Sequence, residues 1–209
     1  MLSRATRYLL AAVQAIVGWE WLVSGLNKVF SGTFPQGLAG TLNQGIQDNP
    51  NAWYVSFLHT VVQPHSIFFG YAIEWTELII GVIFLSGALV LLGRPRMRGE
   101  EQHNLAVGFC AAVAIAGLVG AFLCVNFHFF MGGSVVPGVN PADPFDEGID
   151  LDALLPPISL LIMTTNIVLI TELRQNKLFA RMAVSIKAGF RRFIGIEESH
   201  PVEKLEASK

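Results

Sequence analysis

Long apolar runs, separated by polar and turn-rich stretches, dominate the hydrophobic pattern of the chain. A helix that crosses the hydrocarbon core of a bilayer needs about 20 largely apolar residues, because each residue adds about 1.5 Å to a core about 30 Å thick. Segments long enough for this lie at about 8–30, 67–93, 104–130 and 151–173. The pattern predicts an all-α integral membrane protein, a four-helix bundle whose transmembrane domain covers residues 1–173.

Composition supports a membrane protein and excludes two other classes. Of the 209 residues, 52% are hydrophobic and only 14% are charged, whereas about a quarter of the residues in soluble domains are charged. The lipid bilayer is therefore the first expected partner. The net charge is −2, and no basic run is interleaved with aromatic residues, so we expect no nucleic-acid partner.

The basic residues predict the orientation. They precede the first span, occupy the turn after the second and follow the fourth, whereas 31–66 and 131–150 contain no Lys or Arg. Basic residues favour the cytoplasmic side, so both termini and the 94–103 turn are expected there. No small-x-small cleavage site closes a short apolar core near Ala15, and we interpret the first span as a retained helix rather than a signal peptide. The basic groups are Arg4 and Arg7; Arg94, Arg96 and Arg98; and Arg174, Lys177 and Arg181.

The two outer connections are expected to differ. Glycines and prolines predict turns in the first part of 31–66, and the apolar spacing in 52–63 predicts a short interfacial helix that Pro64 ends. In 131–157, prolines, glycines and five acidic residues predict an acidic, turn-rich cap.

The C-terminal tail shows a further helical pattern. Leu178, Met182, Ile186 and Phe190 recur every fourth residue, with basic residues on other faces. This predicts an amphipathic helix over 174–194 that lies on the cytoplasmic leaflet; a solvated helix that docks on a partner subunit is the alternative. Residues 195–209 are polar and expected to be disordered.

A few polar residues interrupt the apolar spans and are candidates for function, because ionisable groups inside a bilayer are costly unless paired or hydrated. Helix rise places three carboxyl groups at similar depth in the outer half, and spacings of three, four and seven residues allow each helix to turn its set inward. The pattern predicts one polar pocket. Its members are Glu20, Glu74, Glu77, Lys28 and His128, with Ser24, Asn27 and Cys124 nearby.

Such a set suits a quinone. Two or three neighbouring carboxyl groups with one lysine cannot all stay ionised, so at least one is expected to hold a proton at neutral pH. Carboxyl and imidazole groups would exchange protons with the quinone, and Lys28 would stabilise a reduced or anionic species. The aromatic residues expected to stack on its ring are Trp19, Trp21, Tyr71 and Trp75.

Other interpretations remain open. A carboxyl group with Lys28 or Asn27 is equally typical of a buried pair that fixes helix register, and His128 is typical of a hydrogen-bonded residue at a helix end. His59 and His65 are expected at exposed or interfacial positions. A metal site is not expected, since the E-x-x-H spacing of di-iron bundles is absent.

The cysteines and small residues of the third span suggest no further chemistry. Cys110 and Cys124 lie about 21 Å apart along one predicted helix, too far for a disulfide. The chain has no C-x-x-C, which argues against quinone-coupled thiol oxidoreductases. Gly108, Gly117 and Gly120 are expected to form a face for close helix packing.

Two motifs resemble the DoxX/DoxD family of membrane proteins. They are residues 18–28, GWEWLVSGLNK, which end in an S-G-x-x-K pattern, and residues 74–87, EWTELIIGVIFLSG, which contain E-x-x-x-G from Glu77 to Gly81. The resemblance covers about 10–175. It implies a bacterial or archaeal plasma-membrane subunit of a thiosulfate:quinone oxidoreductase type, in which thiosulfate is oxidised at the outer face, quinone is reduced and a second subunit is required.

The charge pattern favours the quinone part of this activity. Thiosulfate is a dianion, and the acidic outer connection would repel it, whereas a quinone arrives from the lipid. The leading hypothesis is therefore a quinone-linked membrane redox subunit. The alternative is a non-catalytic scaffold or accessory subunit of a larger respiratory or photosynthetic complex, which the absence of a cofactor motif and the basic tail also suggest.

Overall fold

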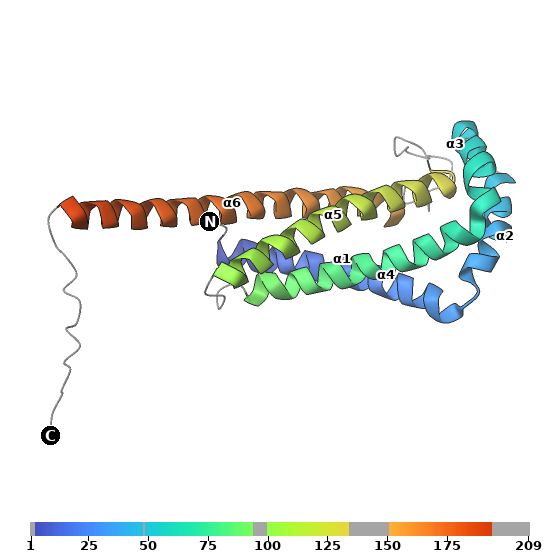
Figure 1. Cartoon of the computed structure of the whole chain (residues 1–209). Helices are drawn as coiled ribbons and strands as arrows, with labels where there is room; N and C mark the ends of the chain where they lie inside the picture. Colours follow the sequence, from blue (N-terminus) through green and yellow to red (C-terminus); the bar gives the residue numbers. More distant parts are fainter. Residues whose placement is uncertain (1–2, 48, 94–99, 134–150, 194–209) are drawn as a thin grey trace, which may run out of the picture. The chain divides into compact units, whose positions relative to one another are not determined.

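The computed structural model describes residues 3–47, 49–93, 100–133 and 151–193. Helices make up almost all of this part of the chain, and it contains no β-strand (Figure 1). A π-helical turn at Leu58–Val62 and a 3-10 turn at Gln63–His65 connect α3 to α4. The α-helices are α1 (Arg4–Ser31), α2 (Phe34–Gln47), α3 (Ala52–Phe57), α4 (Ser66–Gly93), α5 (Glu100–Phe130) and α6 (Leu151–Phe193).

The chain forms two compact units, Met1–Ile170 and Thr171–Lys209. The first contains α1 to α5 and the N-terminal half of α6, whereas the second contains the rest of α6. The helix expected over 174–194 is the continuation of α6, which has no break at residue 174. The side chains after Gln175, on which its amphipathic face depends, lie outside the described part.

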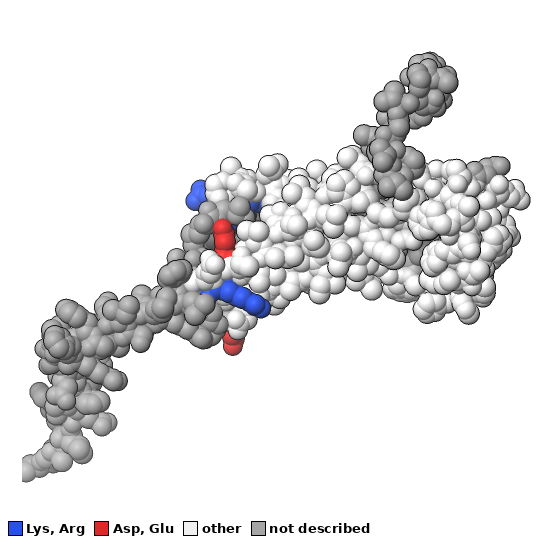
Figure 2. Space-filling model, turned by 90° about the horizontal axis from the view of Figure 1, so that it is seen from above, with Lys and Arg blue, Asp and Glu red and all other residues white. Residues whose placement is uncertain are grey.

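Among the described residues, four helical stretches are long and apolar enough to cross a membrane: Arg4–Ser31, Ala52–Gly93, Glu101–Phe130 and Ala153–Gln175. This confirms the expected all-helical architecture with four candidate spans and indicates a multi-pass membrane protein. On the face of the molecule drawn in Figure 2, a long stretch of the described surface carries no charged side chain, as expected where lipid replaces water.

Glycines allow α1 and α4 to pack backbone to backbone in antiparallel directions. A Cβ atom on Gly25 would lie 2.5 Å from the backbone nitrogen of Leu78, and one on Gly81 would lie 2.5 Å from that of Leu22. Contacts this short exclude any larger residue unless the helices move apart. Small residues are a common means of close helix approach in membranes, where lipid supplies no hydrophobic drive for helix association.

The expected small-residue face of α5 is used in part. A Cβ atom on Gly117 would press on the backbone oxygen of Ser159 in α6, and one on Gly120 would meet the ring of Trp21. Gly108, by contrast, has open space around it. The packing role expected for this face therefore applies to Gly117 and Gly120 but not to Gly108.

A buried amide network links three helices in the interior of the first unit. The side chain of Gln14 on α1 donates a hydrogen bond to the backbone oxygen of Phe84 on α4, at 3.1 Å. Asn166 on α6 donates to Gln14 Oε1 at 3.3 Å and to the oxygen of Ile162 at 2.8 Å. Gln14 and Asn166 are fully buried. Gly87 provides the space, since its Cβ would overlap the Gln14 amide.

The connection from α1 to α4 is more helical than the turn signals predict. Helix α2 runs through Gly37 and Gly40, where turns were expected, because its apolar residues Leu38 and Leu42 are buried against Tyr54 and Leu58. Burial of this apolar stripe outweighs the weak helix propensity of glycine. The expected turns at these two glycines were therefore wrong.

Pro64 does not end the helix that begins at Ala52. The chain passes through the π-helical and 3-10 turns and continues directly into α4. A proline is tolerated at the start of a helical segment, where its missing N–H would have no partner. Pro64 lies at the start of the 3-10 turn. The short helix expected over 52–63 exists, but the expected stop was wrong.

Helices α2 and α3 gather at one end of the bundle, where α1 and α5 end (Figure 1). The side chain of Asn49 donates hydrogen bonds to the backbone oxygens of Phe129 and Phe130, and that of Asn51 donates to Gly133. These bonds satisfy carbonyl groups that the end of α5 leaves without helical partners. We call this the capped end of the bundle.

Two predictions fall outside the described part of the chain. The acidic connection expected over 131–157 lies mostly on residues 134–150, and the tail expected to be disordered covers 195–209.

Candidate functional site

An ion pair between Lys28 and Glu77 joins α1 to α4. The Lys28 ammonium lies 2.6 Å from Oε2 of Glu77 and donates a second hydrogen bond, at 2.8 Å, to Ser24 Oγ. Ser24 in turn donates to the same carboxylate oxygen, at 2.9 Å. The Glu77 side chain is 1% exposed, whereas that of Lys28 is 23% exposed. The carboxylate is thus buried behind a lysine that reaches the surface.

The local sequence explains how these side chains meet. Ser24 and Lys28 are four residues apart and therefore share a face of α1. Gly25, between them, lies against the backbone of Glu77 and Leu78. The glycine contact brings the α1 backbone so close to α4 that the Glu77 carboxylate can reach the hydroxyl and the ammonium together.

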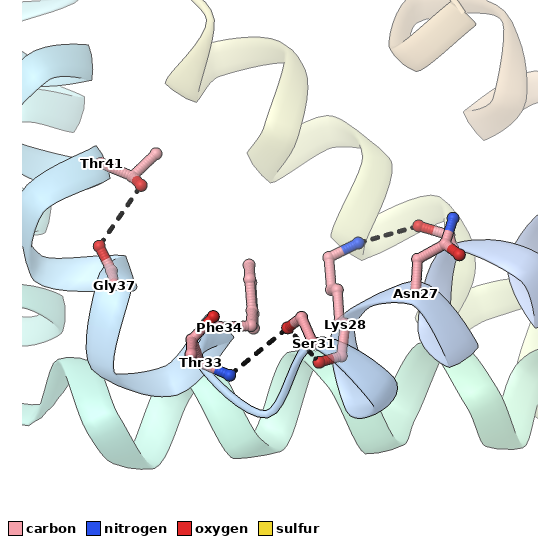
Figure 3. A pocket seen from close by; sticks show the side chains of 8 residues that line it. Asn27, Lys28, Ser31, Thr33, Phe34, Gly37 and Thr41 are labelled. Carbon is pink, nitrogen blue, oxygen red and sulfur yellow. Dashed lines mark hydrogen bonds between the residues drawn. The ribbon is translucent and has the colours of Figure 1, made fainter.

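A pocket of about 440 Å³ opens beside the ion pair, between the C-terminal end of α1 and the first turns of α2 (Figure 3). Its lining is mostly hydroxyl and amide groups, with one cation and one aromatic ring. The eight lining residues are Ser24, Asn27, Lys28, Ser31, Thr33, Phe34, Gly37 and Thr41.

Within this pocket, Lys28 and Phe34 form a combined polar and aromatic surface. The Lys28 nitrogen lies 5.4 Å from the centre of the Phe34 ring, within the range of a cation–π interaction. An ammonium group carries three N–H donors, and in the described part of the chain two of them bond to Ser24 and Glu77. One N–H remains for a ligand in the pocket.

The expected partners of Glu77 and Lys28 are not all assembled here. Glu74 is buried, at 5% exposure, one turn before Glu77 on α4, but it does not line the pocket. Glu74 thus shares the interior face of α4 with Glu77 without joining the ion-pair network.

Glu20 is exposed on the surface of α1, so the prediction that it joins the polar pocket was wrong. The interior face of α1 contains Val17, Trp21 and Gly25. Successive residues of an α-helix are rotated by about 100°, so Glu20 points away from a face that is centred on Trp21. A spacing of four from Ser24 was not sufficient to turn it inward.

His128 lies in the last turn of α5, outside the pocket lining. The helix ends in a Schellman arrangement, in which Gly133 donates to the His128 oxygen and Gly132, with φ of +83°, donates to Phe129. A Cβ atom on Gly133 would overlap the imidazole ring. His128 is therefore placed in the capped end of the bundle, where Tyr54 also bonds to Asn126.

The four aromatic residues expected to stack on a quinone ring differ in burial, and none of them lines the pocket. Trp21 is 4% exposed and packs in the core beside Gly120. Trp19, Tyr71 and Trp75 are 62%, 47% and 49% exposed. Tyr71 and Trp75 are four residues apart and share an outward face of α4, because the interior face is occupied by Glu74, Glu77 and glycines.

Sequence reasoning missed the second half of the pocket, which comes from Ser31, Thr33, Phe34 and Thr41. The available signal was the cluster of hydroxyl residues directly after Lys28, broken by Gly32, whose φ is +64°. It also missed Gln14. In the sequence this is a single polar residue in an apolar span, and only the fold brings Asn166 within hydrogen-bond distance of it.

The remaining candidates offer no metal site in the described part of the chain, where no three His, Cys, Asp or Glu side chains lie close enough to hold an ion. His59 and His65 are exposed, as expected, and His59 bonds to Gln63 at 2.7 Å. Cys110 and Cys124 are buried in α5 and form no disulfide.

This site can bind a small polar molecule through hydroxyl, amide and ammonium groups, and it has a carboxylate within one hydrogen bond of the ammonium. Comparison with known proteins adds no assignment: no family model, no curated protein and no solved structure matches this chain.

Proposed function

We propose that this chain is the membrane subunit of a quinone-linked oxidoreductase and that the pocket between α1 and α2 binds the quinone head group. The observation that carries the proposal is the Lys28–Ser24–Glu77 network at the edge of a 440 Å³ pocket. Perturbed or paired ionisable groups in a cavity are typical of functional sites.

The lining suits a quinone in three respects. The remaining N–H of Lys28 is a donor for a quinone carbonyl oxygen, and the Phe34 ring offers an apolar face beside it. The hydroxyl groups of Ser31, Thr33 and Thr41 can exchange hydrogen bonds with the second carbonyl group. The pocket volume lies within the usual range for small-molecule sites, about 300–1,000 Å³.

The ion-pair network can also hold protons. Reduction of a quinone to a quinol adds two electrons and two protons, and we assign the electrons to a second redox subunit that oxidises the donor. On this chain, Lys28 can release a proton to the ligand through its remaining N–H. Glu77 holds the ammonium in place, and its carboxylate can take up a proton from the aqueous side and pass it to the neutral Lys28 amine, which then delivers the second proton to the ligand. Glu74, one turn away, is a second buried carboxyl group of the same helix face.

Membership of the DoxX/DoxD family, with thiosulfate:quinone oxidoreductase activity, is part of the same proposal. It is supported by contacts between the two motifs, since Gly25 lies against Glu77, Gly81 lies against Leu22, and Lys28 pairs with Glu77. The two sequence motifs therefore form one packed unit.

We further propose that the protein resides in a bacterial or archaeal plasma membrane with both termini in the cytoplasm. Lys28 and the pocket lie at the opposite end of α1 from Arg4 and Arg7. Basic residues favour the cytoplasmic side, so this orientation places the pocket in the outer half of the bilayer.

A binding assay tests the quinone site directly. The purified chain, reconstituted in lipid nanodiscs, would be titrated with a short-chain ubiquinone. We expect saturable binding that Lys28→Met weakens at least about tenfold, the equivalent of one lost hydrogen bond from a charged donor. Thr164→Val is a matched control, because Thr164 is exposed and bonds only to its own helix. Equal binding by Lys28→Met would place the quinone elsewhere.

A second candidate function, a non-catalytic accessory subunit, is favoured by Glu20. This carboxyl group is exposed on α1, about 18 Å along the helix from Tyr8 and thus near the middle of the span. A charged side chain facing lipid there costs about 2.5–3.5 kcal/mol, which a partner helix with a hydrogen-bond donor would offset. Under this alternative the isolated chain binds no quinone, and a partner complex is stable only with Glu20 intact.

A further inference from the structure

The charge of Lys28 is compensated by Glu77, and this determines which class of ligand the pocket accepts. Among the described residues that line the pocket, Lys28 alone is charged, and its ammonium lies 2.6 Å from the buried Glu77 carboxylate. Because the two charges are in contact, their fields largely cancel at the distance of a ligand. The two helix ends that meet at the pocket also have partial charges of opposite sign, negative at the C-terminus of α1 and positive at the N-terminus of α2.

We infer that the pocket selects an uncharged ligand with hydrogen-bond-accepting oxygens and excludes oxyanions, so that a sulfur oxyanion such as thiosulfate is not bound here. The inference rests on the proposed function only in taking the same pocket as the ligand site. It deepens that function by naming the chemical class of ligand that the pocket takes.

The geometry explains why Lys28 acts as a donor rather than as a charge. An anion binds most strongly to a cation that is not already paired with another anion. Two of the three N–H groups of Lys28 are committed to Ser24 and Glu77, and Glu77 is too deeply buried, at 1% exposure, to be displaced by a ligand in the pocket. An oxyanion would therefore lose hydration without finding a free positive charge, whereas a neutral carbonyl oxygen loses little.

The same geometry predicts a gain of function. Replacement of Glu77 by glutamine keeps an oxygen that can accept from Lys28 but removes the negative charge. The pocket then contains an uncompensated cation beside four hydroxyl-bearing residues. We expect Glu77→Gln to bind thiosulfate, and also inorganic sulfate, at least about tenfold more tightly than the unaltered protein.

The experiment compares thiosulfate, sulfate and a short-chain ubiquinone by equilibrium dialysis against the full chain in nanodiscs of neutral lipid. Ser24→Ala is the control, because it removes one partner of Lys28 without changing the charge, so it should not gain anion binding. If Glu77→Gln fails to fold, Ser31→Lys adds a cation at an exposed position of the same lining. That variant should gain anion binding, and Ser31→Asn should not.

The outcomes separate this inference from the proposed function. Anion binding that appears only in the Glu77→Gln or Ser31→Lys variant supports charge compensation, even if ubiquinone binds to none of the proteins, in which case the quinone proposal alone fails. Thiosulfate binding by the unaltered protein as tight as that of the variants would overturn the inference. So would the absence of any gain in a folded variant.

Discussion

The Lys28 ammonium and the Glu77 carboxylate are in direct contact at 2.6 Å, although 49 positions separate the two residues in the chain. Each lies on a helix that is long and apolar enough to cross a membrane. The pair therefore places two opposite charges in direct contact within a largely apolar bundle, beside a polar pocket.

Loss of one member of this pair should be more harmful than loss of both. Lys28→Met leaves the buried Glu77 charge without compensation, which costs about 3–5 kcal/mol when a buried pair is broken. The double variant Lys28→Met with Glu77→Gln should regain most of this stability. The measurement is the free energy of unfolding by denaturing detergent in mixed micelles. Additive losses in the double variant would contradict direct coupling.

The close approach of α1 and α4 should be sensitive to a single methyl group. Gly25→Ala places a Cβ 2.5 Å from the Leu78 nitrogen, so we expect a loss of at least about 1–3 kcal/mol, as for other overpacked sites. Gly40→Ala is the matched control, since Gly40 is a helical glycine with open space around it. It should be neutral or stabilise α2 by about 0.5–1 kcal/mol. Equal changes in stability for Gly25→Ala and Gly40→Ala would show that the close contact between Gly25 and Leu78 does not limit the packing of α1 against α4.

The buried amides should act as one unit. Asn166→Leu removes the donor to Gln14 Oε1, and hydrogen bonds between membrane helices contribute about 0.6–2 kcal/mol. We expect Gln14→Leu and Asn166→Leu to show non-additive losses in a double-mutant cycle measured by thermal unfolding in detergent. Thr164→Val, which affects only a bond within α6, should change little.

Quinone turnover should depend on the carboxyl group of Glu77. If that group exchanges protons with the ligand, Glu77→Gln should lower quinone reduction about 10²-fold or more, the range for lost general acid–base catalysis. The amount of protein in the membrane should not fall. Activity would be assayed in membranes that contain the whole redox complex, with protein quantified by immunoblot. Unchanged quinone turnover in the Glu77→Gln variant would show that the Glu77 carboxyl group does not exchange protons with the ligand.

Glu20 should behave differently from Glu77, because it is exposed on α1 rather than buried. In the isolated chain, Glu20→Leu replaces a charge that faces lipid and should lower the free energy of inserting α1 into the bilayer by about 2.5–3.5 kcal/mol. Ubiquinone binding in nanodiscs should stay the same. A loss of ubiquinone binding in this variant would show that Glu20 contributes to the quinone site. Loss of a co-purified partner would instead support the accessory-subunit alternative.

Much of the fold could be predicted from sequence alone. The four long apolar runs predicted the four candidate spans to within a few residues at most ends, because the thickness of the hydrocarbon core imposes a minimum helix length. Predictions failed where a local signal competed with packing. Gly37 and Gly40 suggested turns, but burial of Leu38 and Leu42 kept α2 helical, and Pro64 began a helical turn rather than ending one.

The candidate site was predicted only in part. Lys28, Ser24 and Glu77 were identified because charged and hydroxyl groups are rare inside apolar spans, and the structure brings these three together. Glu20 and the aromatic residues Trp19, Tyr71 and Trp75 were assigned to the same pocket but face outward. Phe34, which does line the pocket, carried no signal, because its position depends on the turn at Gly32.

The sequence by itself determined the number of candidate spans and the rarity of charge within them, because both follow from the cost of polar groups in hydrocarbon. Only the tertiary structure decided which polar residues meet. Residue spacing shows which side chains share a face of a helix, but it does not show which face turns inward. Here the Gly25 and Gly81 contacts set the rotation of α1 against α4, and that rotation pairs Lys28 with Glu77 and leaves Glu20 outside.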